Sequence, residues 1–143
     1  MNTAGHSSAP LARKLGIGAG CRVVAIDAPA DYDDWIAPLP EGVLFVDAVS
    51  QDVALVHVFA KRRAALAGQL DSLRPRLSPV AALWVSWPKQ ASGVQTDITE
   101  DVIREIALPL GLVDVKVCAV NDVWSGLKLV IRRELRGQPR VAR

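Results

Sequence analysis

The chain has 143 residues, near the commonest size of one domain, which is enough to bury a core without disulfides or metals. Half of the residues are hydrophobic and 22% are charged, so the composition excludes a globally disordered chain. A net charge of +2 is too small for general nucleic-acid binding, and no apolar run approaches the roughly 18 residues of a membrane span. We therefore expect a cytoplasmic domain whose partner is a small molecule or a protein, and neither a nucleic acid nor a membrane.

The first half of the chain alternates short apolar segments with turns. Apolar runs of five to seven residues that are rich in β-branched side chains are typical of buried strands. In chain order the pattern predicts one helical turn at 11–15, a strand at 21–27, a short helix capped by Asp31, and strands at 43–47 and 53–59.

The second half carries two amphipathic segments. Leu66, Leu70, Leu73 and Leu77 are spaced by four, three and four residues, which is the spacing of one helix face. Thr99 is followed by two acids, as expected at a helix start. The elements predicted are a helix at 61–77, a strand at 80–87, a polar loop at 89–98, a helix from Thr99 that Gly111 closes, and strands at 112–120 and 127–133.

Strands that alternate with helices predict a mostly parallel sheet with helices on both faces. The last two strands are joined by only six residues, 121–126, which is too short for a parallel crossover. We therefore predict one three-layer α/β domain over 16–135, with about six strands of which the last is antiparallel. Residues 1–15 are expected to form a loose N-terminal segment and residues 136–143 a basic flexible tail.

This pattern resembles the class I fold of S-adenosylmethionine-dependent methyltransferases. Residues 52–57, DVALVH, resemble the central strand of that fold, and residues 77–85, LSPVAALWV, resemble its later passage from helix to strand. The resemblance implies a Rossmann-like sheet whose last strand inserts antiparallel.

Five segments more closely resemble an uncharacterised bacterial family, domain of unknown function 3052. The resemblance covers roughly residues 11–134, and it implies kinship without an assigned activity. The segments are LARKLGI at 11–17, ALWVSWPK at 82–89, DITED at 97–101, GLVDVKVCAV at 111–120 and VWSGLKLV at 123–130.

The glycines depart from the methyltransferase pattern. Dinucleotide and S-adenosylmethionine folds place glycines after the first strand, where the backbone approaches the ligand. Here Gly16, Gly18 and Gly20 precede the strand, while Pro29, which has no N–H, follows it. One strand–helix unit of the cofactor half is also missing, because few residues separate 43–47 from 53–59. We interpret the chain as a degenerate scaffold that has lost the cofactor site, and we expect no cofactor.

No pattern of nucleophiles, bases or metal ligands stands out. The two cysteines and two histidines have no metal-ligand spacing, and no serine lies in a Gly-x-Ser-x-Gly motif. His57 lies near the carboxyl end of a predicted strand without a carboxylate nearby in sequence, so we expect a hydrogen-bonded, semi-buried imidazole. We assign no catalytic residue and no metal ligand, and we lean against an enzyme.

The candidate binding residues lie where predicted strands end or begin. Asp27 ends the first strand at the carboxyl edge, where open α/β sheets bind ligands, although it could instead cap the following turn or helix. In the strand order that the methyltransferase resemblance implies, the last strand lies beside the fourth and runs antiparallel to it, so the Trp-Pro-Lys and Trp-Ser-Gly segments should meet at the same edge. The tryptophans then either cover the core or form a binding surface. The candidates are Asp27, Trp87, Lys89, Ser92, Trp124 and Ser125.

The function favoured by these patterns is a non-catalytic binding or regulatory module. The alternatives are a small-molecule methyltransferase with an atypical cofactor pocket, and an adaptor that docks on a protein through its tryptophan-bearing edge. A fold alone does not decide among them.

We predict that S-adenosylmethionine does not bind at useful strength. The reason is that Pro29 and the alanines beside it stand where glycines would receive the cofactor. Isothermal titration of the purified chain measures this directly. A dissociation constant near or below about 10 μM, roughly 7 kcal/mol of binding, contradicts the prediction.

Overall fold

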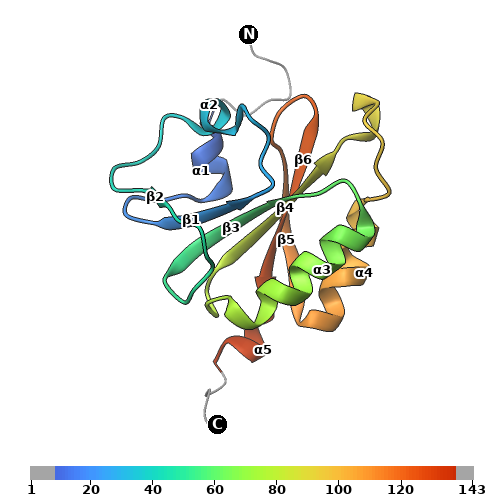
Figure 1. Cartoon of the computed structure of the whole chain (residues 1–143). Helices are drawn as coiled ribbons and strands as arrows, with labels where there is room; N and C mark the ends of the chain where they lie inside the picture. Colours follow the sequence, from blue (N-terminus) through green and yellow to red (C-terminus); the bar gives the residue numbers. More distant parts are fainter. Residues whose placement is uncertain (1–8, 138–143) are drawn as a thin grey trace.

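The computed structural model describes residues 9–137, which form a six-stranded sheet with helices on both faces (Figure 1). The order of the strands across the sheet is β2-β1-β3-β4-β6-β5. The strands are β1 (Arg22–Ile26), β2 (Leu44–Phe45), β3 (Val53–Phe59), β4 (Ala82–Pro88), β5 (Leu112–Ala119) and β6 (Trp124–Ile131). The helices are α1 (Leu11–Leu15), α2 (Tyr32–Ile36), α3 (Arg63–Leu73), α4 (Glu100–Ala107) and α5 (Arg133–Arg136), with 3-10 turns η1 (Arg74–Arg76), η2 (Gln90–Ser92) and η3 (Leu108–Leu110).

The antiparallel last strand is confirmed. β1, β2, β3 and β4 pair in parallel, whereas β6 pairs antiparallel with β4 on one side and with β5 on the other. The chain is therefore a single α/β domain with a Rossmann-like sheet. The carboxyl ends of β1, β3 and β4 and the start of β6 all meet at one edge of this sheet.

Side-chain alternation along the strands divides the core between two faces. One face of the sheet packs against α3 and α4, which lie side by side (Figure 1). The core on this side includes Leu66 and Leu70 of α3 and Ile103 of α4. The other face packs against α1 and α2. On β4 the alternation places Trp84 on the α1 side and Trp87 on the α4 side, as three residues along a strand require.

The ordered domain begins earlier than predicted, because α1 packs into the core. Leu15 is fully buried, and the Nε1 of Trp84 donates a hydrogen bond to the carbonyl oxygen of Leu15 over 2.8 Å. Residues 9–15 are therefore part of the domain and not of a loose segment. The flexible ends predicted at 1–8 and 138–143 lie outside the described residues, and Arg136 ends α5.

Two local predictions were wrong. The last strand begins at Trp124 and not at residue 127, so Trp124 is a strand residue opposite Pro88. Asp31 precedes α2, but its side chain makes no capping hydrogen bond; its carbonyl oxygen accepts from the N–H groups of Asp34 and Trp35. The N-cap role of Thr99 is confirmed, since its hydroxyl accepts from the N–H of Val102. No helix within residues 9–137 is long and apolar enough to cross a membrane.

Candidate functional site

A hollow of about 490 Å³ opens at the carboxyl edge of the sheet, between α2 and α3. We call it the edge pocket. It lies where parallel α/β sheets commonly bind ligands, and its volume falls in the usual range for small-molecule sites. Its lining comes from the turn after β1, from α2, from the β3–α3 junction and from the start of β6. The lining residues are Asp27, Pro29, Trp35, Phe59, Ala60, Lys61, Arg62, Ala65, Gln69 and Trp124.

Aromatic rings form one wall of the edge pocket. Phe59 meets the ring of Trp124 edge-on with centroids 5.0 Å apart, and it meets Trp35 at a tilt over 6.4 Å. The ring of Tyr32 packs edge-on against the rings of both Phe59 and Trp35. Such contacts fix each ring against its neighbours, so the wall is pre-formed.

His57 lies behind this wall and is fully buried. Its Nδ1 is hydrogen-bonded to the hydroxyl of Tyr32 over 2.9 Å and its Nε2 to the hydroxyl of Ser86 over 2.7 Å. Its ring stacks on Phe59 with centroids 4.3 Å apart. Burial lowers the pKa of His57 to about 3, and burial also raises the pKa of Tyr32. The imidazole is therefore neutral and occupied on both nitrogens, which makes it a structural group rather than a general base. The predicted hydrogen bonding is confirmed, with deeper burial than expected.

Asp27 lines the edge pocket with a backbone conformation unusual for a residue with a side chain. Its φ of 59° lies in the left-handed region, which Asp tolerates better than most residues. It does not serve as the helix cap that was one interpretation of its position, because α2 begins after Asp31 without a side-chain cap. Left-handed residues other than glycine concentrate at functional sites, where the surrounding structure holds them.

Sequence reasoning missed two cations of the edge pocket, Lys61 and Arg62. Both are exposed and both line the pocket where the chain passes from β3 to α3. Within residues 9–137 neither has a carboxylate at ion-pair distance, whereas the next residue, Arg63, pairs with Glu105 over 2.8 Å. The run of three basic residues directly after a buried strand was the available signal.

The two tryptophan-bearing segments meet as predicted, but their indoles do not converge. β4 and β6 pair Trp87 with Ser125 and Pro88 with Trp124, and the N–H of Lys89 donates to the carbonyl oxygen of Val123 over 2.7 Å. Because paired residues share a face, Trp124 lies on the α2 side and Trp87 on the α4 side. Only Trp124 reaches the edge pocket.

The remaining predicted residues have local structural roles. The hydroxyl of Ser92 donates to the carbonyl oxygen of Lys89 over 2.6 Å and accepts from the N–H of Val94, which holds the η2 turn. Ser125 lies within β6 between Trp87 and Ala119. Gly126 follows it because a Cβ there would come within 3.2 Å of Trp84 and 3.4 Å of the Ser86 hydroxyl. Packing therefore accounts for most of the Trp-Ser-Gly segment.

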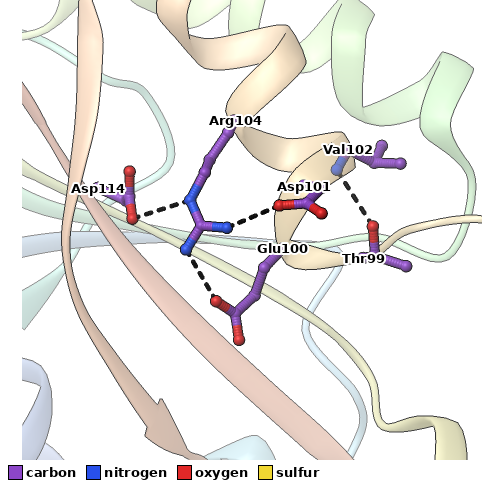
Figure 2. Close-up of polar contacts among 6 residues, drawn as sticks. All are labelled: Thr99, Glu100, Asp101, Val102, Arg104 and Asp114. Carbon is purple, nitrogen blue, oxygen red and sulfur yellow. Dashed lines mark hydrogen bonds and ion pairs between the residues drawn. The ribbon is translucent and has the colours of Figure 1, made fainter.

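Trp87 borders a second, more polar hollow at the start of α4, where the charges are already paired. Figure 2 shows the guanidinium of Arg104 held by Glu100, Asp101 and Asp114, over 2.9, 2.9 and 3.1 Å. Hydrogen bonding to Asp114 is the main cause that raises the pKa of Arg104. This network orients α4 against β5 and leaves no unpaired cation facing the hollow.

The fold is similar to that of solved methyltransferases. A SAM-dependent methyltransferase from Aquifex aeolicus matches with a TM-score of 0.62 at 12% identity, over 85% of this chain and 87% of that chain. A putative type 11 methyltransferase from Sulfolobus solfataricus matches with 0.54 at 10% identity, over 85% and 89%. The m1A22 tRNA methyltransferase TrmK of B. subtilis matches with 0.55 at 12% identity, over 91% and 69%. At identities this low, these matches establish a shared fold and nothing more.

Comparisons of the amino-acid sequence do not assign this chain to a family. A scan against protein-family models finds no match, and a search of curated proteins finds none either. The resemblance to domain of unknown function 3052 therefore stays a prediction, while the class I methyltransferase-like fold is established.

The turn after β1 does not fit S-adenosylmethionine. Residues 27–31 contain no glycine, and Pro29 lines the pocket without an N–H to offer. Rossmann folds place a ribose-binding carboxylate about 20 residues after the first strand. Asp47 stands near that distance, but it is not among the residues that line the edge pocket. The chain therefore presents the edge pocket without the groups that hold the nucleoside half of the cofactor.

We predict that acid destabilises the fold through His57. The imidazole titrates near 6.5 when unfolded and near 3 when folded, so the unfolded chain binds the proton more tightly between these values. The stability contributed by neutral His57 is complete above pH 6.5 and is lost as the pH falls toward 3. Urea unfolding at pH 6 and pH 5 should show a loss about 1.2 kcal/mol larger in the native chain than in His57→Gln. Equal losses in the two chains contradict the prediction.

We predict that Trp87 and Trp124 both stabilise the core. Their exposed fractions are 7% and 9%, so Trp87→Ala and Trp124→Ala should each cost about 3–5 kcal/mol in urea unfolding. Val80→Ala is the control, because Val80 is 83% exposed and its truncation should change stability by less than about 0.5 kcal/mol. A loss below about 1 kcal/mol at either tryptophan contradicts the prediction.

Proposed function

We propose that this chain is a ligand-binding module without catalytic activity, built on a methyltransferase-like scaffold, and that a small molecule occupies the edge pocket. The supporting observation is that one hollow of about 490 Å³ at the carboxyl edge gathers three aromatic rings and two cations that have no ion-pair partner in the part of the chain that the structure describes. Concave sites that are mostly apolar with a few convergent polar groups are typical of ligand pockets.

The side chains of the edge pocket favour binding over catalysis. The titratable groups among its lining residues are Asp27, Lys61 and Arg62, and none of them has a partner arranged as in a nucleophile–base pair. The nearby His57 lies behind Phe59 with both nitrogens bonded and with a pKa of about 3. A ligand in the pocket would therefore meet the carboxylate of Asp27 but no histidine base.

A methyltransferase is the second candidate, and two observations favour it. The solved structures that share the fold include methyltransferases, and the rings of Trp35, Phe59 and Trp124 could face a sulfonium cation. Methyl transfer depends mainly on positioning, so the lack of an arranged nucleophile–base pair does not exclude it. Titration with S-adenosylmethionine separates the two candidates, since tight binding would favour the enzyme.

An adaptor that docks through exposed tryptophans is less well supported, because Trp87 and Trp124 are mostly buried. We also propose, on the segments at 82–89 and 123–130, that the chain belongs to domain of unknown function 3052 and that it acts in the cytoplasm.

The four tryptophans allow a direct test of where a ligand binds. Trp35 and Trp124 line the edge pocket, Trp87 borders the second hollow, and Trp84 is buried against α1. Titration with the planar dye anilinonaphthalene sulfonate should shift the indole N–H signals of Trp35 and Trp124 in nitrogen–proton correlation spectra. Signals of Trp84 and Trp87 should stay in place. No shift at 1 mM dye (roughly 4 kcal/mol of binding), or a shift confined to Trp87, overturns the proposal.

A further inference from the structure

We infer that the ligand of the edge pocket is a planar aromatic acid, whose ring system packs against Trp35 and Trp124 and whose acidic group is bound by Lys61 and Arg62. This inference rests on the proposed function and names the chemical class of its ligand. It follows from the placement of rings and charges around one opening.

The rings set the shape of the ligand. Trp35 comes from α2, Phe59 from the end of β3 and Trp124 from the start of β6, so flat surfaces reach the pocket from three separate elements. Phe59 and Trp124 are held edge-on to one another at 5.0 Å, and Trp35 is only half-buried. A flat unsaturated ligand can stack on such surfaces, whereas a branched aliphatic ligand would contact them poorly.

The charges of the lining residues indicate that the ligand is negatively charged. The lining residues include two cations, Lys61 and Arg62, and one anion, Asp27. Asp97 lies beside Arg62 at a neighbouring hollow, where its Oδ1 accepts from the N–H of Arg63 over 2.6 Å, and it is not among the residues that line the edge pocket. The pocket therefore keeps a net positive charge with no ion pair to neutralise Lys61 or Arg62 among residues 9–137. A partly enclosed site with this balance attracts an anion.

The position of the cations gives the acidic group a defined place. Lys61 is fixed by its backbone, because its carbonyl oxygen accepts from the hydroxyl of Thr96 over 2.8 Å and from the N–H of Asp97 over 3.3 Å. Arg62 comes next and precedes the first turn of α3. The two charges thus stand on a backbone anchored to the 96–97 loop, next to the aromatic wall. An arginine beside a lysine suits a carboxylate, sulfonate or phosphate group.

The test compares two dyes of nearly equal shape, of which one is charged. Anilinonaphthalene sulfonate carries an acidic group, and phenylnaphthylamine lacks it. We expect the native chain to bind the sulfonate about tenfold more tightly, a difference of about 1.4 kcal/mol, with a preference that weakens as salt is added. The Lys61→Met/Arg62→Met double variant should lose this preference and keep its affinity for the neutral dye.

Two further variants serve as controls. Arg63→Met removes the neighbouring cation, which is paired with Glu105 and does not line the pocket, and it should change neither affinity by more than about twofold. Ala65→Trp fills an exposed lining position on α3 and should weaken both dyes. Far-ultraviolet circular dichroism of each variant verifies the fold.

The possible results separate the inference from the proposed function. If the native chain binds both dyes equally, or if the double variant keeps the preference for the sulfonate, the inferred ligand class is wrong. The binding module survives that result, provided that the indole signals of Trp35 and Trp124 still shift. If neither dye shifts those signals, the proposed function itself fails.

Discussion

The buried imidazole of His57 ties together three elements that the edge pocket needs. It stands on β3, bonds Tyr32 at the start of α2 on one side, and bonds Ser86 on β4 on the other. An unpaired polar group at this depth would cost a few kcal/mol, so both partners are constrained. Tyr32 in turn fixes α2, a helix of only five residues that could not be stable alone, and thereby places Trp35 at the pocket. Phe59 stacks on the same imidazole and contacts the ring of Trp124 edge-on, which extends the aromatic wall of the pocket.

Strand alternation explains why two distinctive tryptophan segments do not form one site. β4 is paired on both sides, so each of its side chains must enter one core or the other. Trp84 and Ser86 enter the α1–α2 side, where Gly126 leaves room for both, and Trp87 enters the α3–α4 side. The segments are thus unusual in sequence because they fill a crowded sheet edge. A segment whose residues are required for packing is hard to distinguish from a functional motif until the register of the strands is known.

The sequence could predict the strands and the antiparallel end of the sheet, because these follow from hydrophobic runs and loop lengths. It also indicated the carboxyl edge as the place of a candidate site, because open α/β sheets commonly bind ligands there. It could not predict that Trp87 and Trp124 face opposite ways, since this depends on the pairing of Pro88 with Trp124, and a shift of one residue would reverse it. The helical turn at 11–15 was predicted, but its packing into the core was not, because five residues have little helical stability until Trp84 bonds Leu15. Lys61 and Arg62 were passed over because charged residues after a strand are usually solvated, and only the pocket distinguishes them from Arg63.

The fold alone does not determine what the carboxyl edge of the sheet can hold. The sheet keeps its carboxyl edge and its antiparallel strand, which place a hollow where the fold commonly binds ligands. The turn after β1, however, contains no glycine and leads into a helix of five residues, whose Trp35 lines the pocket. The acid after β2, Asp47, is not among the residues that line the pocket. A shared fold therefore leaves the choice of ligand to the groups at this edge, because affinity is decided by those groups and not by the sheet beneath them.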